Sequence, residues 1–290
     1  MAADDYASPP RTVGRDAVFV RHRHKSPQVA DSAYIAPTAV LCGDVTVGPH
    51  SRVLFGAVVT AEGGPVEIGA HCVVMENAVV RGVPQHPTRL GDHVVVGPHA
   101  SLTGCVVEGD TRIATGAVVF NGARIEVGAE LEFHSVVFVN TVVPAGVAVP
   151  MGWFAGGDPA ELVPPSDRDR IRALMGPLDY AGTVFGVSGG DDVVPDIARR
   201  YARSLALHQR DQVLPPGQHA RLDDGRPAEP PPVWAAGPSS PGPRRPKISA
   251  GSPGRNVPCR CDASPISRFR CRSARPSASW RRSQAASASS

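Results

Sequence analysis

The sequence has few aromatic residues and no long apolar run. Aromatic side chains make up 5% of its 290 residues, whereas glycine and proline number 30 each. Such a composition favours many short strands and turns over a core built on large rings. No stretch approaches the roughly 18 apolar residues of a membrane-spanning helix, and residues 1–11 lack the apolar segment of a secretory signal. We therefore expect a cytoplasmic protein without membrane contact.

Acidic residues are almost absent from the C-terminal part of the chain. From Arg244 onward the sequence is rich in Arg and Ser, so the small formal charge of +3 is unevenly spread. From Pro215 no periodic apolar pattern remains, which predicts a disordered tail over residues 215–290. Arginine-rich segments can contact phosphates weakly, but nothing in this tail specifies a nucleic-acid site, and nucleic acid is not an expected partner.

The six cysteines form two groups. Cys259, Cys261 and Cys271 lie in the tail at a spacing that is not typical of a zinc site. The other three, Cys42, Cys72 and Cys105, lie within the repeat described next, where we predict small buried thiols.

An aliphatic residue recurs every six positions along most of the first half of the chain. Nineteen positions follow this period, apart from two short interruptions and one step of five residues, and all are Val, Ile or Leu: Ile35, Leu41, Val47, Val53, Val59, Ile68, Val74, Val80, Leu90, Val96, Leu102, Val107, Ile113, Val119, Ile125, Leu131, Val137, Val143 and Val149. The residue two places before each is mostly Ala or Ser, and Gly, Asp, Asn and Pro fill the turns between. A strict period of six is incompatible with a helix.

This repeat predicts an all-β solenoid, a parallel β-helix in which three six-residue segments form one coil. Nineteen segments correspond to about six coils. We expect an N-terminal extension over residues 1–30, the β-helix over 31–165 and a helical segment over 166–214. Within the last, Asp167 could cap a helix that ends near Met175, and residues 195–213 have amphipathic helical spacing.

The two interruptions are the natural places to look for function. They span residues 60–67 and 81–89. In a solenoid, insertions emerge as loops from one edge, and such loops commonly carry functional residues.

The sequence resembles the γ-class carbonic anhydrases and their relatives, the hexapeptide-repeat acyltransferases, over about residues 33–164. The matching stretches are AVVTAEGGPVEIGA (57–70), VVMENAVVRG (73–82), LGDHVVVGPHASLTGC (90–105) and GGDPAELV (156–163). The resemblance implies a left-handed β-helix, an exception to the usual right-handed crossover. It also implies a homotrimer with active sites at the subunit boundaries.

The metal ligands of that family are replaced in this chain. In its catalytic members three histidines bind zinc, two from one subunit and one from its neighbour, and the zinc-bound water attacks CO₂. These positions correspond to Arg81, Pro98 and Thr103. The family's Arg–Asp pair falls on Thr60 and Glu62, and its glutamine on Met75, whereas the acid that follows persists as Glu76. Zinc is therefore not expected at the family positions.

The remaining histidines offer one alternative metal site. His50, His71, His93, His99 and His134 each follow a repeat position by three residues, where His tolerates the left-handed conformation of a turn. We predict that these are exposed corner residues. His86 differs because it lies in the second insertion, and together with His99 it could form a displaced site across a subunit boundary.

Three functions remain open from the sequence. The first is a γ-carbonic-anhydrase-like protein without zinc-dependent CO₂ hydration, in which Arg81, Glu62 and Glu76 line an altered inter-subunit pocket for a small anionic ligand. Arg81 could equally pair with a glutamate across the trimer interface. The second is an acyltransferase that uses acyl-CoA, with His86, or less favourably His134, as general base. The third is a non-enzymatic trimeric scaffold.

Overall fold

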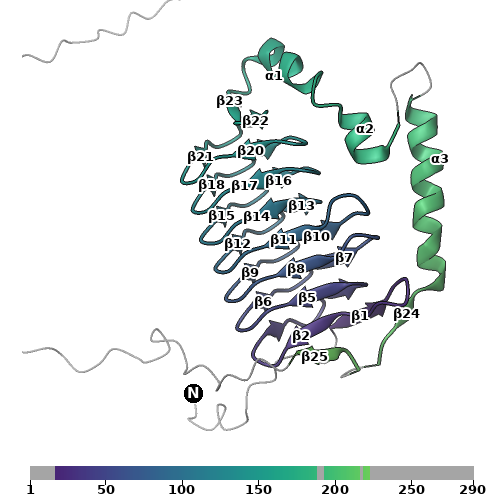
Figure 1. Cartoon of the computed structure of the whole chain (residues 1–290). Helices are drawn as coiled ribbons and strands as arrows, with labels where there is room; N and C mark the ends of the chain where they lie inside the picture. The colour runs from purple at the N-terminus through teal and green to yellow at the C-terminus, as the bar shows by residue number, and fades with distance from the viewer. Residues whose placement is uncertain (1–16, 188–192, 216–217, 223–290) are drawn as a thin grey trace, which may run out of the picture. The chain divides into compact units, whose positions relative to one another are not determined.

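The computed structural model describes residues 17–187, 193–215 and 218–222. Three sheets of short strands form a left-handed parallel β-helix (Figure 1). The helices are α1 (Arg168–Met175), α2 (Tyr180–Phe185) and α3 (Val193–Leu205), followed by the 3₁₀ helix η2 (Ala206–Arg210). Helix α3 runs along the length of the coils, whereas α1 lies beside their last turn (Figure 1). None of the helices in these ranges combines the length and the apolarity needed to cross a bilayer.

The ten-stranded sheet is parallel except at its two ends. Its members are β1 (Val18–Arg21), β4 (Val40–Cys42), β7 (Val58–Ala61), β10 (Val79–Gly82), β13 (Ser101–Thr103), β16 (Val118–Val119), β19 (Val136–Val137), β22 (Phe154–Gly156), β23 (Glu161–Val163) and β24 (Gln212–Val213). The antiparallel strands β23 and β24 cover the two edges. Covered edges protect a sheet from pairing with other chains.

The other two sheets follow the same order of coils. The eight-stranded sheet contains β2 (Gln28–Ala30), β5 (Val45–Val47), β8 (Val66–Ile68), β11 (Thr88–Leu90), β14 (Val106–Val107), β17 (Arg124–Ile125), β20 (Val142–Val143) and β25 (Ala220–Leu222). The seven-stranded sheet contains β3 (Tyr34–Ile35), β6 (Arg52–Val53), β9 (Val73–Val74), β12 (Val95–Val96), β15 (Arg112–Ile113), β18 (Glu130–Leu131) and β21 (Ala148–Val149).

The core of the solenoid is the aliphatic ladder that the sequence predicts. All nineteen repeat positions are buried, with side chains no more than 3% exposed. The register stacks them on their own kind, so that Leu41, Val59 and Val80 occupy equivalent positions on β4, β7 and β10. The small residues two places earlier are buried as well, as Ala57, Ala78 and Ala100 show. The predicted ladder is confirmed.

The solenoid has about eight turns rather than the six predicted. Residues 18–35, of which the first thirteen fall in the predicted N-terminal extension, form a complete first coil. There Phe19 pairs with Leu41 and Val29 with Val47. The period is hidden because Phe19 is aromatic and a loop at residues 22–25 separates it from Val29. At the other end Ala155 on β22 continues the ladder beside Val137.

The helical segment agrees with the sequence pattern in its main elements. Asp167 caps α1, accepting a hydrogen bond from Arg170 N, and α1 ends at Met175 as expected. The second predicted helix is α3, which ends at Leu205 and continues as η2. The predicted tail lies outside the described residues except at 215 and 218–222, where Ala220–Leu222 forms β25 beside β2.

The corner histidines adopt the backbone conformation that their positions predict. His50, His71, His93, His99 and His134 all have positive φ between 56° and 60°. Three of them stack along one corner, with ring centroids 4.9 Å apart for His50 and His71 and 5.3 Å apart for His71 and His93. Stacked imidazoles at successive corners are a structural feature of the coil, and they do not line the cavity described below.

Candidate functional site

Both insertions leave the solenoid at the same edge, as predicted for a repeat protein. The first joins β7 to β8 and the second joins β10 to β11. The loops lie against each other, since Glu62 N donates to Gly82 O at 2.8 Å. Gly64 is required by this contact, because a Cβ atom there would lie 2.0 Å from Val83 O. Val83 and His86 close the second loop through a pair of backbone hydrogen bonds, each 3.0 Å long.

Arg81 on β10 links the loops to helix α3. Its Nε lies 3.4 Å from Glu62 Oε1 without the geometry of a hydrogen bond, and it finds no other partner among the described residues. Its Nη1 donates to Tyr201 Oη at 2.7 Å. The Glu62 side chain is only 14% exposed, so this ion pair is better shielded than one at an open surface. The pair that the sequence left open across a trimer interface is thus formed within one chain.

The residues at the family's metal positions do not fit zinc. Arg81 and Thr103 are paired neighbours on β10 and β13. Pro98 lies at the other end of these strands, in the corner before β13. A guanidinium already held by Glu62 and Tyr201 places a fixed positive charge at the first position, and proline has no side-chain donor.

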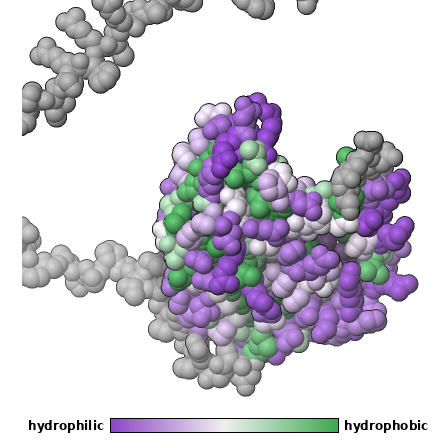
Figure 2. Space-filling view, turned by 45° about the horizontal axis from the view of Figure 1, so that its top comes forward, coloured by the Kyte–Doolittle hydropathy of each residue, from purple (hydrophilic) through white to green (hydrophobic). Residues whose placement is uncertain are grey.

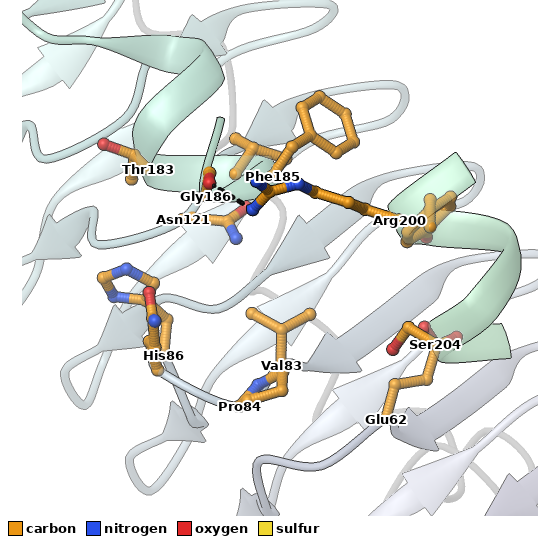
Figure 3. A pocket seen from close by; sticks show the side chains of 13 residues that line it. Glu62, Val83, Pro84, His86, Asn121, Thr183, Phe185, Gly186, Arg200 and Ser204 are labelled. Atoms are coloured by element: carbon orange, nitrogen blue, oxygen red, sulfur yellow. Dashed lines mark hydrogen bonds between the residues drawn. The ribbon is translucent and has the colours of Figure 1, made fainter. Parts of the chain in front are cut away.

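A cavity of about 210 Å³ lies between the two loops and the helices (Figure 3). Its lining comes from both insertions, from one turn of the solenoid and from α2 and α3: Glu62, Val83, Pro84, Gln85, His86, Asn121, Thr183, Val184, Phe185, Gly186, Arg200, Tyr201 and Ser204. The space-filling view shows the surface hollowed between the coils and the helices (Figure 2). This arrangement shields a small molecule on several sides.

Some polar groups of the cavity have hydrogen-bond partners and others have none among the described residues. Asn121 is 2% exposed, and its Oδ1 has no hydrogen-bond partner among the described residues. A buried acceptor without a partner is costly, so it marks a place where a ligand or water donor fits. Arg200 donates through Nη1 to Gly186 O at 2.9 Å, which holds its guanidinium at the rim (Figure 3). His86 and Glu62 lie on opposite sides of the opening (Figure 3).

The structure brings some of the predicted site residues together and separates others. Glu62 and His86 line the cavity, and Arg81 contacts two of its lining residues. Glu76 lies at the opposite corner, where its backbone oxygen accepts from His99 N at 3.0 Å. His134 also lies at that corner and is not part of the lining. His86 and His99 therefore lie at opposite ends of the strands within one chain. A metal site formed by these two residues across a subunit boundary stays a prediction.

Sequence reasoning missed the residues that the helices and a distant turn supply. Asn121 follows the ladder position Val119 by two and looks like an ordinary turn residue. Arg200, Tyr201 and Ser204 belong to a helix whose register against the coils no local pattern specifies. The run of arginines on α3 contributes Arg200 to the rim.

Similarity to known proteins agrees with this architecture. The chain is 32% identical over 145 residues to γ carbonic anhydrase 1, mitochondrial, of Arabidopsis thaliana, a match that covers 48% of this chain and 50% of that protein. Over this matched region the chain is similar to the γ carbonic anhydrases. It is also 29% identical over 107 residues to a carbonic anhydrase of Geobacillus kaustophilus, covering 37% of this chain and 59% of the relative.

The extent of these matches is limited. The chain spans about half the length of the first curated relatives, and no protein-family model matches it. A solved hexapeptide transferase family protein from Anaplasma phagocytophilum is 20% identical with a TM-score of 0.38, covering 67% of this chain and 98% of that one. A TM-score this low says nothing about function.

Proposed function

We propose that this γ-carbonic-anhydrase-like protein does not hydrate CO₂ through zinc at the family positions and instead binds a small anionic ligand beside Arg81. The observation that carries the proposal is the state of Arg81, which stands at the first metal position and is held there by Glu62 and Tyr201. The arginine is locked by partners from a loop and a helix, so it acts as a fixed cation rather than as space for a metal.

The chemistry of the cavity narrows the ligand class. Arg81, which lies behind the lining, neutralises Glu62, so the guanidinium of Arg200 is left as the positive charge of the lining and favours an anion. The unpaired Asn121 Oδ1 requires a donor. A small carboxylate or phosphate that also bears a hydroxyl or amino group satisfies both requirements. The volume of about 210 Å³ suits a small metabolite.

Binding can be tested by thermal unfolding of the full chain with small hydroxy- and amino-acids and sugar phosphates. A ligand at about a hundred times its Kd adds about 2.7 kcal/mol to the free energy of unfolding. We expect stabilisation by at least one such anion, reduced at least about tenfold in affinity by Asn121→Leu and by Arg200→Gln, since a charged hydrogen bond contributes about 1.5–3 kcal/mol. Arg199→Gln, on the same helix outside the lining, is the matched control.

The loss of the family's zinc site is tested by restoring its ligands. We expect the triple variant Arg81→His, Pro98→His and Thr103→His to bind additional zinc relative to the parent chain. No additional zinc in a folded triple variant would show that these are not the equivalent positions. Zinc-dependent CO₂ hydration by the parent chain that is abolished by changes at Arg81, Pro98 or Thr103 would overturn the proposal.

An acyltransferase is the second candidate, because His86 lines the cavity and could serve as general base toward a bound acceptor. The same unfolding measurement with acetyl-CoA and longer acyl-CoAs separates the two functions. Stabilisation by acyl-CoA, together with acyl transfer that His86→Gln abolishes, would favour the transferase. Stabilisation by small anions alone supports the first proposal.

We also propose that the chain assembles as a homotrimer. Phe55, Phe133 and Met151 project from the corner before the ten-stranded sheet and are 49%, 46% and 59% exposed. Pro98 lies at the same corner, where the family resemblance implies the subunit boundary. The adjoining outer face of the sheet carries half-buried valines at positions 40, 58, 79, 118 and 136. A second copy of the chain would cover this apolar surface. A chain that forms a trimer and is stabilised by none of the tested ligands would favour the non-enzymatic scaffold.

A further inference from the structure

A second group of reactive side chains lies away from the cavity, at the first coil. It consists of His22, Cys42, His208 and Asp211, and each offers one ligand atom within 4.8 Å of the others. None of these residues lines the cavity. His22 and Cys42 are 2% and 6% exposed, whereas the side chains of His208 and Asp211 are 33% and 17% exposed. This histidine–cysteine–aspartate group is the largest concentration of metal-binding chemistry that the described residues contain.

The positions of the four residues are set by separate parts of the fold. His22 directly follows β1, and Cys42 is the last residue of the neighbouring strand β4. The ladder pairs these two strands, so the two side chains emerge on the same side of the sheet. His208 lies in η2, and Asp211 follows it immediately before β24. Because β24 pairs with β1 through Val20 and Val213, the C-terminal segment is held over the first coil.

Asp211 is the centre of the group. Its Oδ1 lies 2.6 Å from His22 Nδ1, and its Oδ2 lies 2.7 Å from His208 Nδ1. Cys42 Sγ donates to Oδ2 at 3.9 Å. The two imidazoles stack with centroids 4.3 Å apart, so their nitrogens reach the carboxylate from adjacent directions. Two imidazoles, one thiol and one carboxylate thus converge on a single point.

We propose that His22, Cys42, His208 and Asp211 form a structural binding site for zinc. Zinc takes four nitrogen, sulphur and oxygen ligands at about 2.0–2.3 Å in a tetrahedron, so that ligand atoms lie about 3.3–3.8 Å apart. The ligand atoms of the cluster lie within 4.8 Å of one another, and a bound ion would lengthen the His22–Asp211 and His208–Asp211 contacts from 2.6 and 2.7 Å. The mixed donor set suits zinc better than magnesium or calcium, which prefer oxygen ligands.

The ionisation of Cys42 and Asp211 is set by burial and by their neighbours in the group. Burial and the neighbouring carboxylate of Asp211 raise the pKa of Cys42 to about 11. Burial acts to raise the pKa of Asp211 as well, but the hydrogen bonds and charges of His208 and His22 outweigh it and lower that pKa below its ordinary value. A divalent cation would stabilise the thiolate directly, and the cysteine would then be a ligand rather than a buried thiol beside a carboxylate.

The place of the site suggests its role. All four ligands come from the protein, as is typical of structural rather than catalytic zinc. The ion would join residues 189 positions apart, His22 and Asp211, and fasten η2 and β24 to the start of the solenoid. Helix α3 directly precedes η2 and supplies Tyr201 and Arg200 to the cavity. The zinc site would therefore hold the far end of the helix that completes the cavity.

The test is the zinc content of the full chain, prepared without a metal-binding tag and measured by mass spectrometry of the metal. All variants should carry Ser in place of Cys259, Cys261 and Cys271, so that the tail cysteines contribute no zinc. We expect about one zinc per chain, falling below about a tenth in Cys42→Ser and in His22→Gln. Cys72→Ser, a buried cysteine elsewhere in the repeat, and His86→Gln should keep the zinc.

Two further readouts guard against loss of folding in the variants. Cobalt in place of zinc should give the charge-transfer absorption of a thiolate–cobalt bond in the parent chain and not in Cys42→Ser. Removal of metal by a chelator should lower the melting temperature of the parent chain and leave that of Cys42→Ser unchanged. A parent chain that takes up less than about a tenth of a zinc per chain when supplied with the ion would overturn the proposal. The four residues would then be a hydrogen-bonded group centred on Asp211 that binds no metal.

Discussion

At the scale of single residues, Arg81 shows how a substitution at an inherited position changes the chemistry of a site. The strand pairing places Thr60, Arg81 and Thr103 side by side on β7, β10 and β13. The identity of Arg81 and its position in the repeat are plain from the sequence. Its two partners are not, because Glu62 lies in a loop of irregular length and Tyr201 lies 120 residues away.

The hydroxyl of Tyr201 should contribute measurably to stability. Tyr201→Phe removes the only hydrogen bond that Arg81 makes to helix α3 among the described residues. We expect a loss of about 0.5–1.5 kcal/mol in the free energy of unfolding, measured by urea denaturation. Tyr34→Phe is the control, since the Tyr34 hydroxyl makes no hydrogen bond within the described ranges. Equal effects of the two changes would contradict this role for Tyr201.

His219 should make the stability of the fold depend on pH. Burial, aided by the charge of Arg221 and opposed by that of Asp31, lowers the pKa of His219 below its ordinary value of 6.5. Its ring stacks on Phe19 with centroids 4.5 Å apart, and Nδ1 is buried without a partner in the described chain. The unfolded state binds the proton more tightly than the folded state. The contribution of the neutral His219 to the free energy of unfolding is therefore complete above about pH 6.5 and declines as the pH falls toward the pKa of His219 in the folded state.

Denaturation of His219→Phe and of the parent chain at several pH values checks this expectation. The parent chain should lose stability relative to His219→Phe as the pH is lowered from about 8 to about 5. His134→Asn, at an exposed corner where Asn tolerates the positive φ, should follow the parent chain. If the free energy of unfolding varied with pH in the same way in the parent chain and in His219→Phe, the titration of His219 would be ruled out as a cause.

At the scale of secondary-structure elements, the strands were predictable and the packing of the helices was not. Each strand is specified within six residues by one aliphatic and one small residue, so the pattern is local and repeats many times. The helices carry weaker patterns. Ile197 and Leu205 of α3 are half-buried, whereas Tyr201 and Leu207 are each 38% exposed, so the apolar spacing alone does not say which face meets the coils.

Removal of one rung of the ladder should destabilise the whole solenoid. Leu102 is fully buried on β13 between Val80 and Val119. Leu102→Ala leaves a cavity in a closely packed core and should cost about 2–5 kcal/mol in the free energy of unfolding. Val127→Ala, at a corner where the side chain is 48% exposed, should change it by less than about 0.5 kcal/mol. Similar losses in both variants would show that the ladder is not the stabilising element.

At the scale of the whole molecule, the apolar corner and the half-buried valines of the ten-stranded sheet form the surface on which we propose that a second chain packs. The corner carries Phe55, Phe133 and Met151 in equivalent positions on different coils, so the surface extends over most of the solenoid. One strand edge of the ten-stranded sheet is covered by β23 and the other by β24. Association would therefore occur through side chains of the corner and face rather than by strand addition.

A charge placed in this corner should disrupt the proposed trimer. Phe133→Asp buries an unpaired carboxylate if the corner is an interface, and we expect the trimer to dissociate in sedimentation experiments. Val127→Asp, at a different and equally exposed corner, should leave the assembly unchanged. A parent chain that sediments as a monomer would contradict the homotrimer.

The sequence by itself determined the solenoid, because a six-residue period is a local rule that each coil satisfies independently. The prediction that Arg81, Pro98 and Thr103 replace the family's metal ligands also comes from the periodic region, where the resemblance can be followed residue by residue. Only the tertiary structure decided that Arg81 pairs within its own chain, that α2 and α3 complete a cavity, and that His22, Cys42, His208 and Asp211 meet. Those contacts join segments separated by up to 189 residues, and no period connects them. They depend on where the helices lie against the coils, which is set by scattered aromatic contacts and strand pairing rather than by a repeated pattern.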